Sequence, residues 1–183
     1  MASEDGRLLL NYARDGDVDS LSALVIRNAR WLTAFLRGMS RSDEDVEDAF
    51  QETWARVIKS CSSYRGGSVR VYLSRAARSA VIDAARRAGR SPAPLAGDDA
   101  AAAEIPDDAP GPAEAFESRA TYEEVRGAVR ALPEGQREVL LMRFEGGLTF
   151  KEISEATGLP IGTVLTRMYA ATDRLRGVLG EKK

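Results

Sequence analysis

A proline-rich, acidic segment at residues 88–118 divides the sequence into two parts. It holds five of the seven prolines of the chain, a run of four alanines and two pairs of aspartates. Proline blocks helix continuation, and the other side chains of this segment offer little apolar surface to bury. We therefore expect a flexible linker that joins two small domains, at residues 1–87 and 119–183.

Both domains show the apolar spacing of helices, and nothing reads as a strand. In the first domain, we expect Gly38 to end one helix and Ser42 with Asp45 to form a capping box for the next helix, at 43–60. Ser68 is expected to cap a helix that runs to residue 87. Beyond the linker, helices are expected from about 116 to 131, up to Phe144, up to Ala156 and up to about Val178. The fold class is therefore predicted to be all-α.

The end of the chain has the pattern of a helix-turn-helix. Thr149 and Glu152 form a second capping-box pattern, and a turn is expected at 157–160 before the last helix. Small residues at the start of that helix would let its backbone amides approach a phosphate. Thr166, Arg167 and Tyr169 are expected to point outward, towards the major groove. A helical hairpin that only packs within the protein is the alternative.

Charge is unevenly distributed along the chain. The net charge is −2, but residues 88–120 carry −5, so the remainder sums to +3. Residues 65–87 hold six arginines and a single acid, Asp83. Such a local basic stripe favours phosphate binding regardless of the global balance. An ordinary solvated helix face would carry the same residues.

The composition disfavours an enzyme. The chain has no histidine, the commonest general base and metal ligand, and its one cysteine, Cys61, has no partner for a disulfide. We expect no catalytic residue, metal site or cofactor. The N-terminus does not resemble a signal peptide, and no apolar run reaches the roughly 20 residues that span a bilayer. The chain is therefore expected to stay in the cytoplasm.

Two sets of motifs, one on each side of the linker, resemble the extracytoplasmic-function sigma factors of the sigma-70 family. The first domain matches region two through the segments 45–48, 51–53, 64–68 and 72–75, together with Ile82-Asp83 and Arg86-Arg87. The second domain matches region four through Leu132-Pro133, 137–139, 147–153 and 162–167. The resemblance covers roughly residues 8–87 and 120–178, and the two sets occur in the family's order.

The resemblance implies that helix 43–60 binds core RNA polymerase. The implied contacts lie on one broad polar side, opposite Phe50 and Trp54. A solvated acidic face and a carboxylate metal cluster are the alternative interpretations. The implied polymerase-binding residues are Asp45, Asp48, Gln51 and Glu52.

The resemblance implies that the loop at 64–68 captures a flipped base of the −10 promoter element, and that the next helix follows the strand. A glycine-rich loop with an aromatic ring and an arginine is suited to this task. Tyr64 could instead be a loop anchor packed on the domain. The implied −10 contacts are Tyr64, Arg65, Ser68, Arg75, Arg78, Ser79, Asp83, Arg86 and Arg87.

The last helix is implied to read the −35 element. Leu165 and Ala170 stand where the family often has basic residues, so recognition of this element is expected to be weak or unusual. Ser79 and Tyr72 also depart from the family pattern on the −10 helix. The implied −35 contacts are Gly162, Thr163, Leu165, Thr166, Arg167 and Tyr169.

The sequence therefore predicts a sigma factor that binds core RNA polymerase and promoter DNA and is controlled by an anti-sigma factor. With the inhibitor bound, the two domains are expected to pack together or around it. Two alternatives stay open: a sigma-like module that binds a regulator without initiating transcription, and a stand-alone helix-turn-helix regulator. The second alternative leaves the first domain unexplained.

Overall fold

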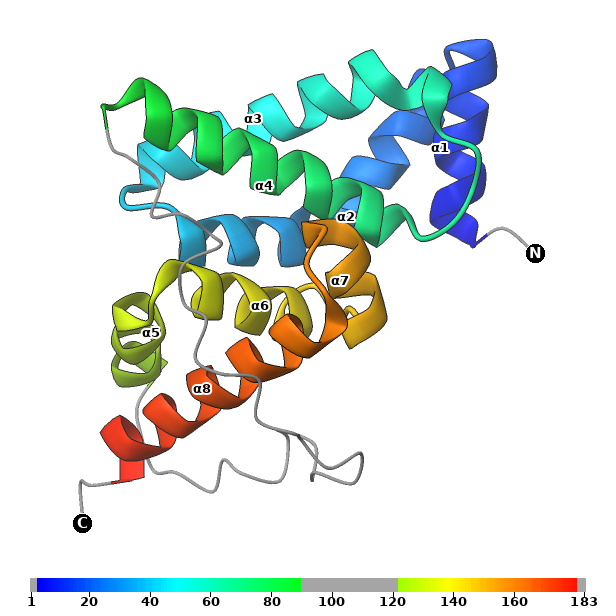
Figure 1. Ribbon diagram of the computed structural model, residues 1–183. Helices are drawn as coiled ribbons and strands as arrows, with labels where there is room; N and C mark the ends of the chain where they lie inside the picture. Colours follow the sequence, from blue (N-terminus) through cyan, green and yellow to red (C-terminus); the bar gives the residue numbers. More distant parts are fainter. Residues whose placement is uncertain (1–2, 90–121, 181–183) are drawn as a thin grey trace.

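Two groups of helices, α1–α4 and α5–α8, pack against each other in the computed structural model, which describes residues 3–89 and 122–180 (Figure 1). The described residues contain no strand, so the predicted all-α class is confirmed. The α-helices are α1 (Glu4–Asp15), α2 (Val18–Met39), α3 (Asp43–Ser60), α4 (Val69–Arg87), α5 (Tyr122–Ala131), α6 (Glu134–Phe144), α7 (Phe150–Thr157) and α8 (Ile161–Gly180); a 3-10 turn, η1, covers Cys61–Ser63.

The helices begin at the caps that the sequence predicts. Ser42 and Asp45 form the capping box of α3, and Thr149 and Glu152 form that of α7. The Ser68 hydroxyl accepts a hydrogen bond from the backbone N–H of Val71 at the start of α4, at 3.5 Å. Each cap satisfies a backbone N–H that has no partner within its helix. The expected linker, 88–118, lies almost wholly outside the described residues, as does the expected start of a helix near residue 116.

Apolar side chains from both groups form one contiguous core. Leu32, Phe35 and Leu73 are fully buried in the first group, and Met142 and Ile153 are fully buried in the second. The core continues across the seam between the groups because α6 contacts α2 and α7 contacts α4 (Figure 1). The two halves of the chain therefore share buried surface.

The prediction that Gly38 ends its helix is wrong. The helix continues to Met39, with Ser40 as its C-cap, and Gly38 faces α6 across the seam. A Cβ atom at Gly38 would lie 2.5 Å from Cδ1 of Leu141. The glycine lets α2 and α6 approach closely, a reason for glycine that spacing within one helix cannot reveal.

Candidate nucleic-acid interface

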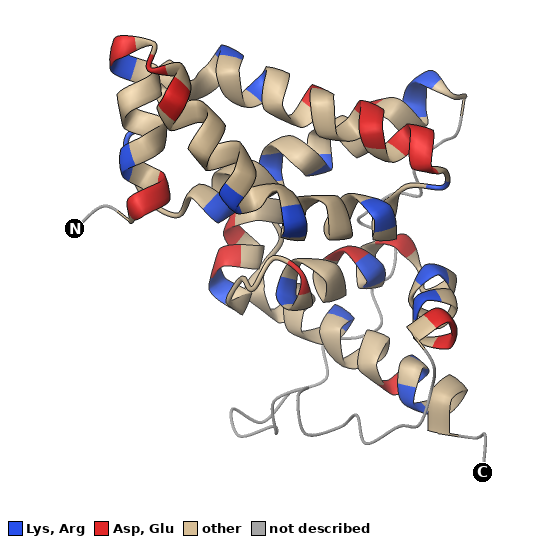
Figure 2. Cartoon of the chain, turned by 180° about the vertical axis from the view of Figure 1, so that it is seen from behind, with Lys and Arg blue, Asp and Glu red and all other residues tan. Residues whose placement is uncertain are grey.

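The outer side of α3 carries the residues assigned to polymerase binding, and acidic residues gather at the start of this helix (Figure 2). Asp48 and Gln51 are exposed. Asp45 is half-buried, and its carboxylate accepts a hydrogen bond from the backbone N–H of Ser42 at 3.2 Å, within the capping box. Glu52 is half-buried and engaged by Arg56 at 2.7 Å. Asp48 and Gln51 thus form the open centre of this face, and the other two also have local structural partners.

Arg56, which the sequence analysis did not single out, connects this face of α3 to α4. Its guanidinium lies 3.0 Å from the Asp83 carboxylate and donates to the Ser79 hydroxyl at 2.7 Å, besides its contact with Glu52. Burial alone would lower the pKa of Arg56, but the hydrogen bonds to Glu52 and Asp83 outweigh it and raise the pKa. Two assigned −10 residues are therefore held in place by a residue of α3.

The loop that precedes α4 is anchored by Tyr64. The Tyr64 side chain is buried, its hydroxyl donates to the backbone oxygen of Gly67 at 2.8 Å, and its ring centroid lies 5.5 Å from that of Tyr72. Burial raises the pKa of the Tyr64 hydroxyl. Gly66 and Gly67 have φ angles of 110° and 99°, which favour glycine. In this conformation Tyr64 is a loop anchor, and base capture by its ring stays a prediction.

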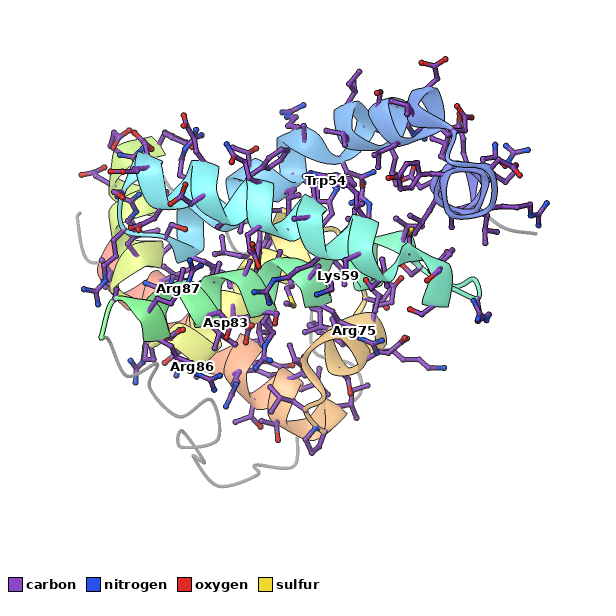
Figure 3. The ribbon with its side chains drawn as sticks, turned by 90° about the horizontal axis from the view of Figure 1, so that it is seen from above. Trp54, Lys59, Arg75, Asp83, Arg86 and Arg87 are labelled. Carbon is purple, nitrogen blue, oxygen red and sulfur yellow. The ribbon has the colours of Figure 1, made fainter. Side chains whose placement is uncertain are left out.

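The arginines of α4 fall into two sets (Figure 3). Arg75 donates to the backbone oxygen of Glu155 on α7 at 2.8 Å, and Arg78 donates to the Glu138 carboxylate on α6 at 2.7 Å. Arg86 and Arg87, at the end of α4, are exposed. The predicted basic stripe therefore has one part that is hydrogen-bonded to α6 and α7, in which Arg75 is still exposed and Arg78 is half-buried, and another part at the end of α4 without such bonds.

The helix-turn-helix consists of α7, a turn at Gly158 with φ of 75°, and α8. Gly162 and Tyr169 are exposed, and Thr163 and Leu165 are half-buried. Thr166 is also half-buried, and its hydroxyl donates to the backbone oxygen of Gly162 at 2.9 Å. The start of α8 thus presents most of the residues assigned to the −35 element.

The expectation that Arg167 points outward is wrong. Its side chain is only 4% exposed, and it shares the inward side of α8 with Val164, Met168 and Ala171. These positions recur at helical spacing, so the phase of the helix already favoured burial of residue 167. A Cβ atom at Gly135 would lie 2.7 Å from NH1 of Arg167, so the guanidinium rests against α6. A role for Arg167 in DNA binding stays untested.

Glu138 on α6 is a buried carboxylate that the sequence analysis missed. Only 1% of the residue is exposed. Burial raises the pKa of Glu138, whereas the positive charges of Arg78 and Arg167 work in the opposite direction. An ionised carboxylate away from water requires such compensation. No signal within the second half of the sequence could identify this residue, because its hydrogen-bonded partner lies on α4.

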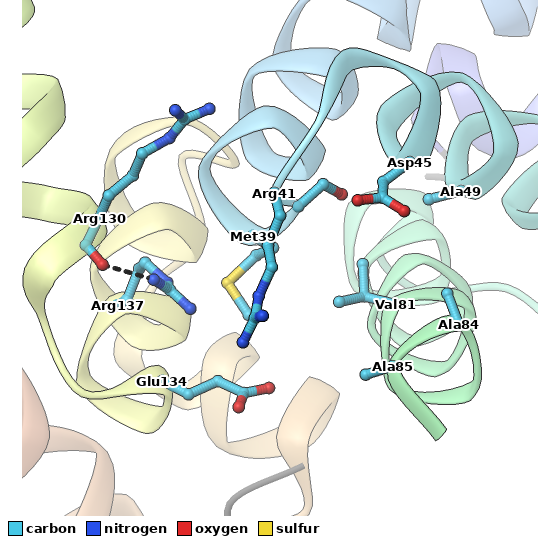
Figure 4. A pocket seen from close by; sticks show the side chains of 11 residues that line it. Met39, Arg41, Asp45, Ala49, Val81, Ala84, Ala85, Arg130, Glu134 and Arg137 are labelled. Carbon is cyan, nitrogen blue, oxygen red and sulfur yellow. Dashed lines mark hydrogen bonds between the residues drawn. The ribbon is translucent and has the colours of Figure 1, made fainter. Parts of the chain in front are cut away.

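A cavity of about 390 Å³ lies at the seam, between α2, α3 and α4 on one side and α5 and α6 on the other (Figure 4). Met39 and Ala49 contribute apolar surface, and Arg41, Arg130 and Arg137 contribute positive charge. Burial lowers the pKa of Arg137, and the charges of Arg130 and Arg41 lower it further. Because both halves line the cavity, it depends on their being packed together.

Within residues 3–89 and 122–180, no group of three or more acidic, cysteine or histidine side chains is placed to hold a metal ion. None of the helices in these two ranges combines the length and hydrophobicity that a membrane span requires. Cys61 is buried, and its thiol donates to the backbone oxygen of Ile58 at 3.1 Å. Burial of this kind is typical of a cysteine that packs within the fold rather than of a reactive one, and Cys61 is the only cysteine of the sequence.

Comparison with known proteins matches each half to a family. Residues 24–91 match "Sigma-70 region 2", and residues 122–175 match "Sigma-70, region 4". The chain is 27% identical to the "ECF RNA polymerase sigma factor SigE" of Mycolicibacterium smegmatis over 88% of its own length, and it spans only 62% of that relative. It is 31% identical to the "ECF RNA polymerase sigma factor ShbA" of Streptomyces griseus, over 93% of both chains.

The fold also resembles that of CnrH, solved in complex with the cytosolic domain of CnrY, with a TM-score of 0.71 and 19% identity over 99% of this chain and 100% of that one. The two family matches occur in the order that the sequence motifs predict, and the match to ShbA runs through both halves. The chain belongs to the extracytoplasmic-function sigma factors of the sigma-70 family.

Proposed function

We propose that this protein directs RNA polymerase to promoters from within the cytoplasm. In this proposal, α1–α4 bind the core enzyme and the −10 element, and α5–α8 bind the −35 element. The observation that carries the proposal is the presence, in one chain, of both sigma regions on either side of the segment that the structure leaves undescribed. A stand-alone helix-turn-helix regulator would not account for the region 2 half. Sigma factors are initiation factors rather than enzymes, so no catalytic residue is assigned.

The outer face of α3 is the proposed polymerase contact. The exposed side chains of Asp48 and Gln51 are free to meet a partner, whereas Asp45 and Glu52 also serve the fold of this half. Most of the contact energy is therefore assigned to the first pair. Loss of a few exposed contacts at the centre of an interface commonly costs more than loss of those at its rim.

Promoter contacts are assigned to the loop at 64–68, the arginines of α4 and the start of α8. Arginine suits this role because its planar guanidinium donates to phosphate oxygens in pairs. The region 2 half would hold the unpaired strand of the −10 element, and binding energy would offset the cost of unstacking its bases. At the −35 element, the small residues Gly162 and Thr163 would let the backbone of α8 approach a phosphate.

Control by an anti-sigma factor completes the proposal. CnrH was solved with the cytosolic domain of CnrY, and a second sigma factor of similar fold, RpoE of Bartonella quintana, with the anti-sigma factor NepR, at a TM-score of 0.68. We extend this kind of regulation to the present chain. A sigma-like module that binds a regulator but not polymerase is the alternative that the next experiment separates.

The test is binding of the purified full-length chain to core RNA polymerase free of other sigma factors, followed by transcription from a library of promoter fragments. Binding, with start sites that share two spaced motifs, would support the proposal. The double variant Asp48→Ala/Gln51→Ala is expected to bind core polymerase about tenfold or more weakly, because each buried interface contact is worth about 1 kcal/mol or more.

Asp15→Ala is the matched control, since Asp15 is an exposed acid on α1, away from this face. It is expected to bind polymerase as the wild type does. Failure of the wild-type chain to bind the core enzyme, with no inhibitor present, would instead favour the sigma-like regulatory module.

A further inference from the structure

The cavity at the seam gathers three arginines that come from three different segments of the chain. Arg41 follows the end of α2, Arg130 lies near the end of α5, and Arg137 lies near the start of α6 (Figure 4). Two acids, Asp45 and Glu134, line the same cavity. Like charges repel one another at short range, so packing of the helices does not by itself explain why these arginines meet.

Two of the guanidinium groups have no acidic partner. Within the described ranges, neither Arg41 nor Arg137 forms an ion pair with a carboxylate. NH1 of Arg137 donates to the backbone oxygen of Arg130 at 2.7 Å, but its Nε is buried and has no hydrogen-bond partner in the described part of the chain. A buried donor without an acceptor costs free energy. This side of the cavity therefore has hydrogen-bond donors in excess of acceptors.

The two acids do not cancel this excess. The carboxylate of Asp45 is engaged in the capping box of α3, where it accepts a hydrogen bond from the backbone N–H of Ser42 at 3.2 Å. Glu134 lies in the first turn of α6, where the helix dipole favours an acid. Burial lowers the pKa of Arg137, and the charges of Arg130 and Arg41 lower it further, although the charge of Glu134 opposes them. The positive charge of Arg137 is thus only partly compensated.

The opposite side of the cavity is small and apolar. Val81, Ala84 and Ala85 of α4 form much of it, with Met39 at the end of α2 (Figure 4). Short side chains leave a smooth wall against which a flat ring can pack. The volume of about 390 Å³ lies within the range of roughly 300–1,000 Å³ that small-molecule sites occupy. Arg41 is exposed, so a ligand can enter from solvent.

We propose that this cavity binds a small organic phosphate with an apolar ring, of the size of a mononucleotide. The phosphate lies between Arg41 and Arg137, since planar guanidinium groups donate to phosphate oxygens in pairs. The ring packs on the alanines of α4, and hydroxyl groups of the sugar donate to Glu134. None of the three arginines has a role in the proposed function, so this site goes beyond it. Because both halves of the chain line the cavity, the ligand also ties them together.

The probes are AMP, GMP, CMP and UMP, titrated into the purified full-length chain by isothermal titration calorimetry. At least one is expected to bind, and its nucleoside and ribose 5-phosphate are each expected to bind tenfold or more weakly, because each lacks one part of the contacts. At ten times its dissociation constant, the nucleotide should raise the melting temperature by about 3–6 °C, since it binds only the packed chain.

Two variants separate the roles of the two walls. Arg41→Ala removes an exposed side chain and should weaken nucleotide binding at least tenfold, with no effect on the nucleoside. Ala85→Leu narrows the cavity without any change of charge and should also weaken nucleotide binding. Arg14→Ala is the matched control, because Arg14 is an exposed arginine on α1 and does not line the cavity. It should bind the nucleotide as the wild type does.

Three results would overturn the proposal. The first is that none of the four nucleotides binds the wild type, and the second is that a nucleoside binds as tightly as its phosphate. The third is that Arg41→Ala and Arg14→Ala lose affinity equally, which would reveal unspecific attraction to surface arginines. Ribose 5-phosphate that bound as tightly as the nucleotide would exclude the ring from the site and so refute the assigned ligand class. These assays contain neither polymerase nor DNA, so their failure is distinguishable from a failure of the proposed function.

Discussion

At the scale of single residues, the structure separates the assigned side chains that are exposed from those that are buried. Asp48, Gln51, Arg86 and Arg87 are exposed, whereas Tyr64 and Arg167 are buried. All six were assigned from motifs, which identify a position but not the environment of its side chain. Function at the buried positions requires a change of conformation that exposes them, and function at the exposed ones does not.

Arg86→Ala/Arg87→Ala should weaken DNA binding without opening the chain. Both side chains lie outside the seam, so the radius of gyration should match that of the wild type. Loss of two phosphate contacts should lower affinity for single-stranded DNA and reduce the salt slope by about 1.4, at about 0.7 per contact. Fluorescence anisotropy across a salt series measures both effects.

The comparison variant is Arg75→Ala/Arg78→Ala, which removes two residues of the seam as well as two proposed phosphate contacts. It should expand the chain and also fail to gain DNA affinity. An unchanged salt slope for Arg86→Ala/Arg87→Ala would remove those two residues from the proposed interface.

Some of this residue-level detail was within reach of the sequence. Arg167 follows Val164 and precedes Met168 and Ala171 on the inward stripe of α8, so helical phase alone predicts its burial. Glu52 and Arg56 stand four residues apart, a spacing that favours an ion pair. The burial of Glu138 could not be predicted in this way, because the arginine that compensates its charge lies 60 residues earlier in the sequence.

At the scale of elements, the caps explain why the helices begin where they do. Ser42, Ser68 and Thr149 each precede a helix that starts at the next residue. These signals are local, since a cap involves only the first turn of its own helix, and they were therefore readable from sequence. The end of α2 was misjudged because the role of Gly38 depends on a helix that lies 100 residues further along the chain.

The cap of α7 predicts a pH dependence of stability. The backbone N–H of Thr149 lowers the pKa of Glu152, and this outweighs the opposing effect of burial; a hydrogen bond from the Ser68 side chain lowers it further. A carboxylate with a depressed pKa stabilises the fold above its unfolded-state pKa of about 4.3, and this contribution is lost as pH falls through the lower folded value.

Glu152→Gln should therefore lower the free energy of unfolding by about 1 kcal/mol at neutral pH, and the difference from the wild type should shrink below about pH 4. Urea denaturation at stepwise lower pH measures it. Glu145→Gln, at an exposed position after α6, should show no such convergence. A difference that stayed constant down to pH 3 would assign the effect of Glu152 to something other than its charge.

At the scale of the whole molecule, the contiguous core joins two halves that the sequence predicted as separate domains. The apolar periodicity of each half predicts its helices, but it says nothing about which helix faces meet across the undescribed segment. Leu141 is buried partly against Gly38, and Val71 and Ser74 are buried on a helix that contacts both α3 and α7. Their burial reflects contacts between elements distant in sequence, which no local pattern encodes.

Gly38→Ala should separate the halves while strengthening α2. Alanine favours a helix interior over glycine by about 1 kcal/mol. At this position, however, its Cβ would collide with the buried side chain of Leu141. We expect the wild type to unfold in urea in a single transition because its halves share a core, and the variant to unfold in two.

Gly127→Ala provides the control, because a Cβ at this glycine of α5 would meet no atom within 4 Å. It should raise stability slightly and keep the single transition. A single transition for Gly38→Ala at wild-type stability would mean that the seam contributes little to cooperativity.

The position of Arg78 links the proposed contact with the promoter to the contact between the two halves of the chain, two properties that selection would otherwise adjust independently. If Arg78 contacts the promoter as proposed, a substitution at this residue changes its promoter contact and its hydrogen bond to Glu138 together. Variants with tighter promoter specificity should therefore accumulate compensating changes on α6. Among related sigma factors, substitutions on α4 should therefore occur together with substitutions on α6, on the other side of the seam.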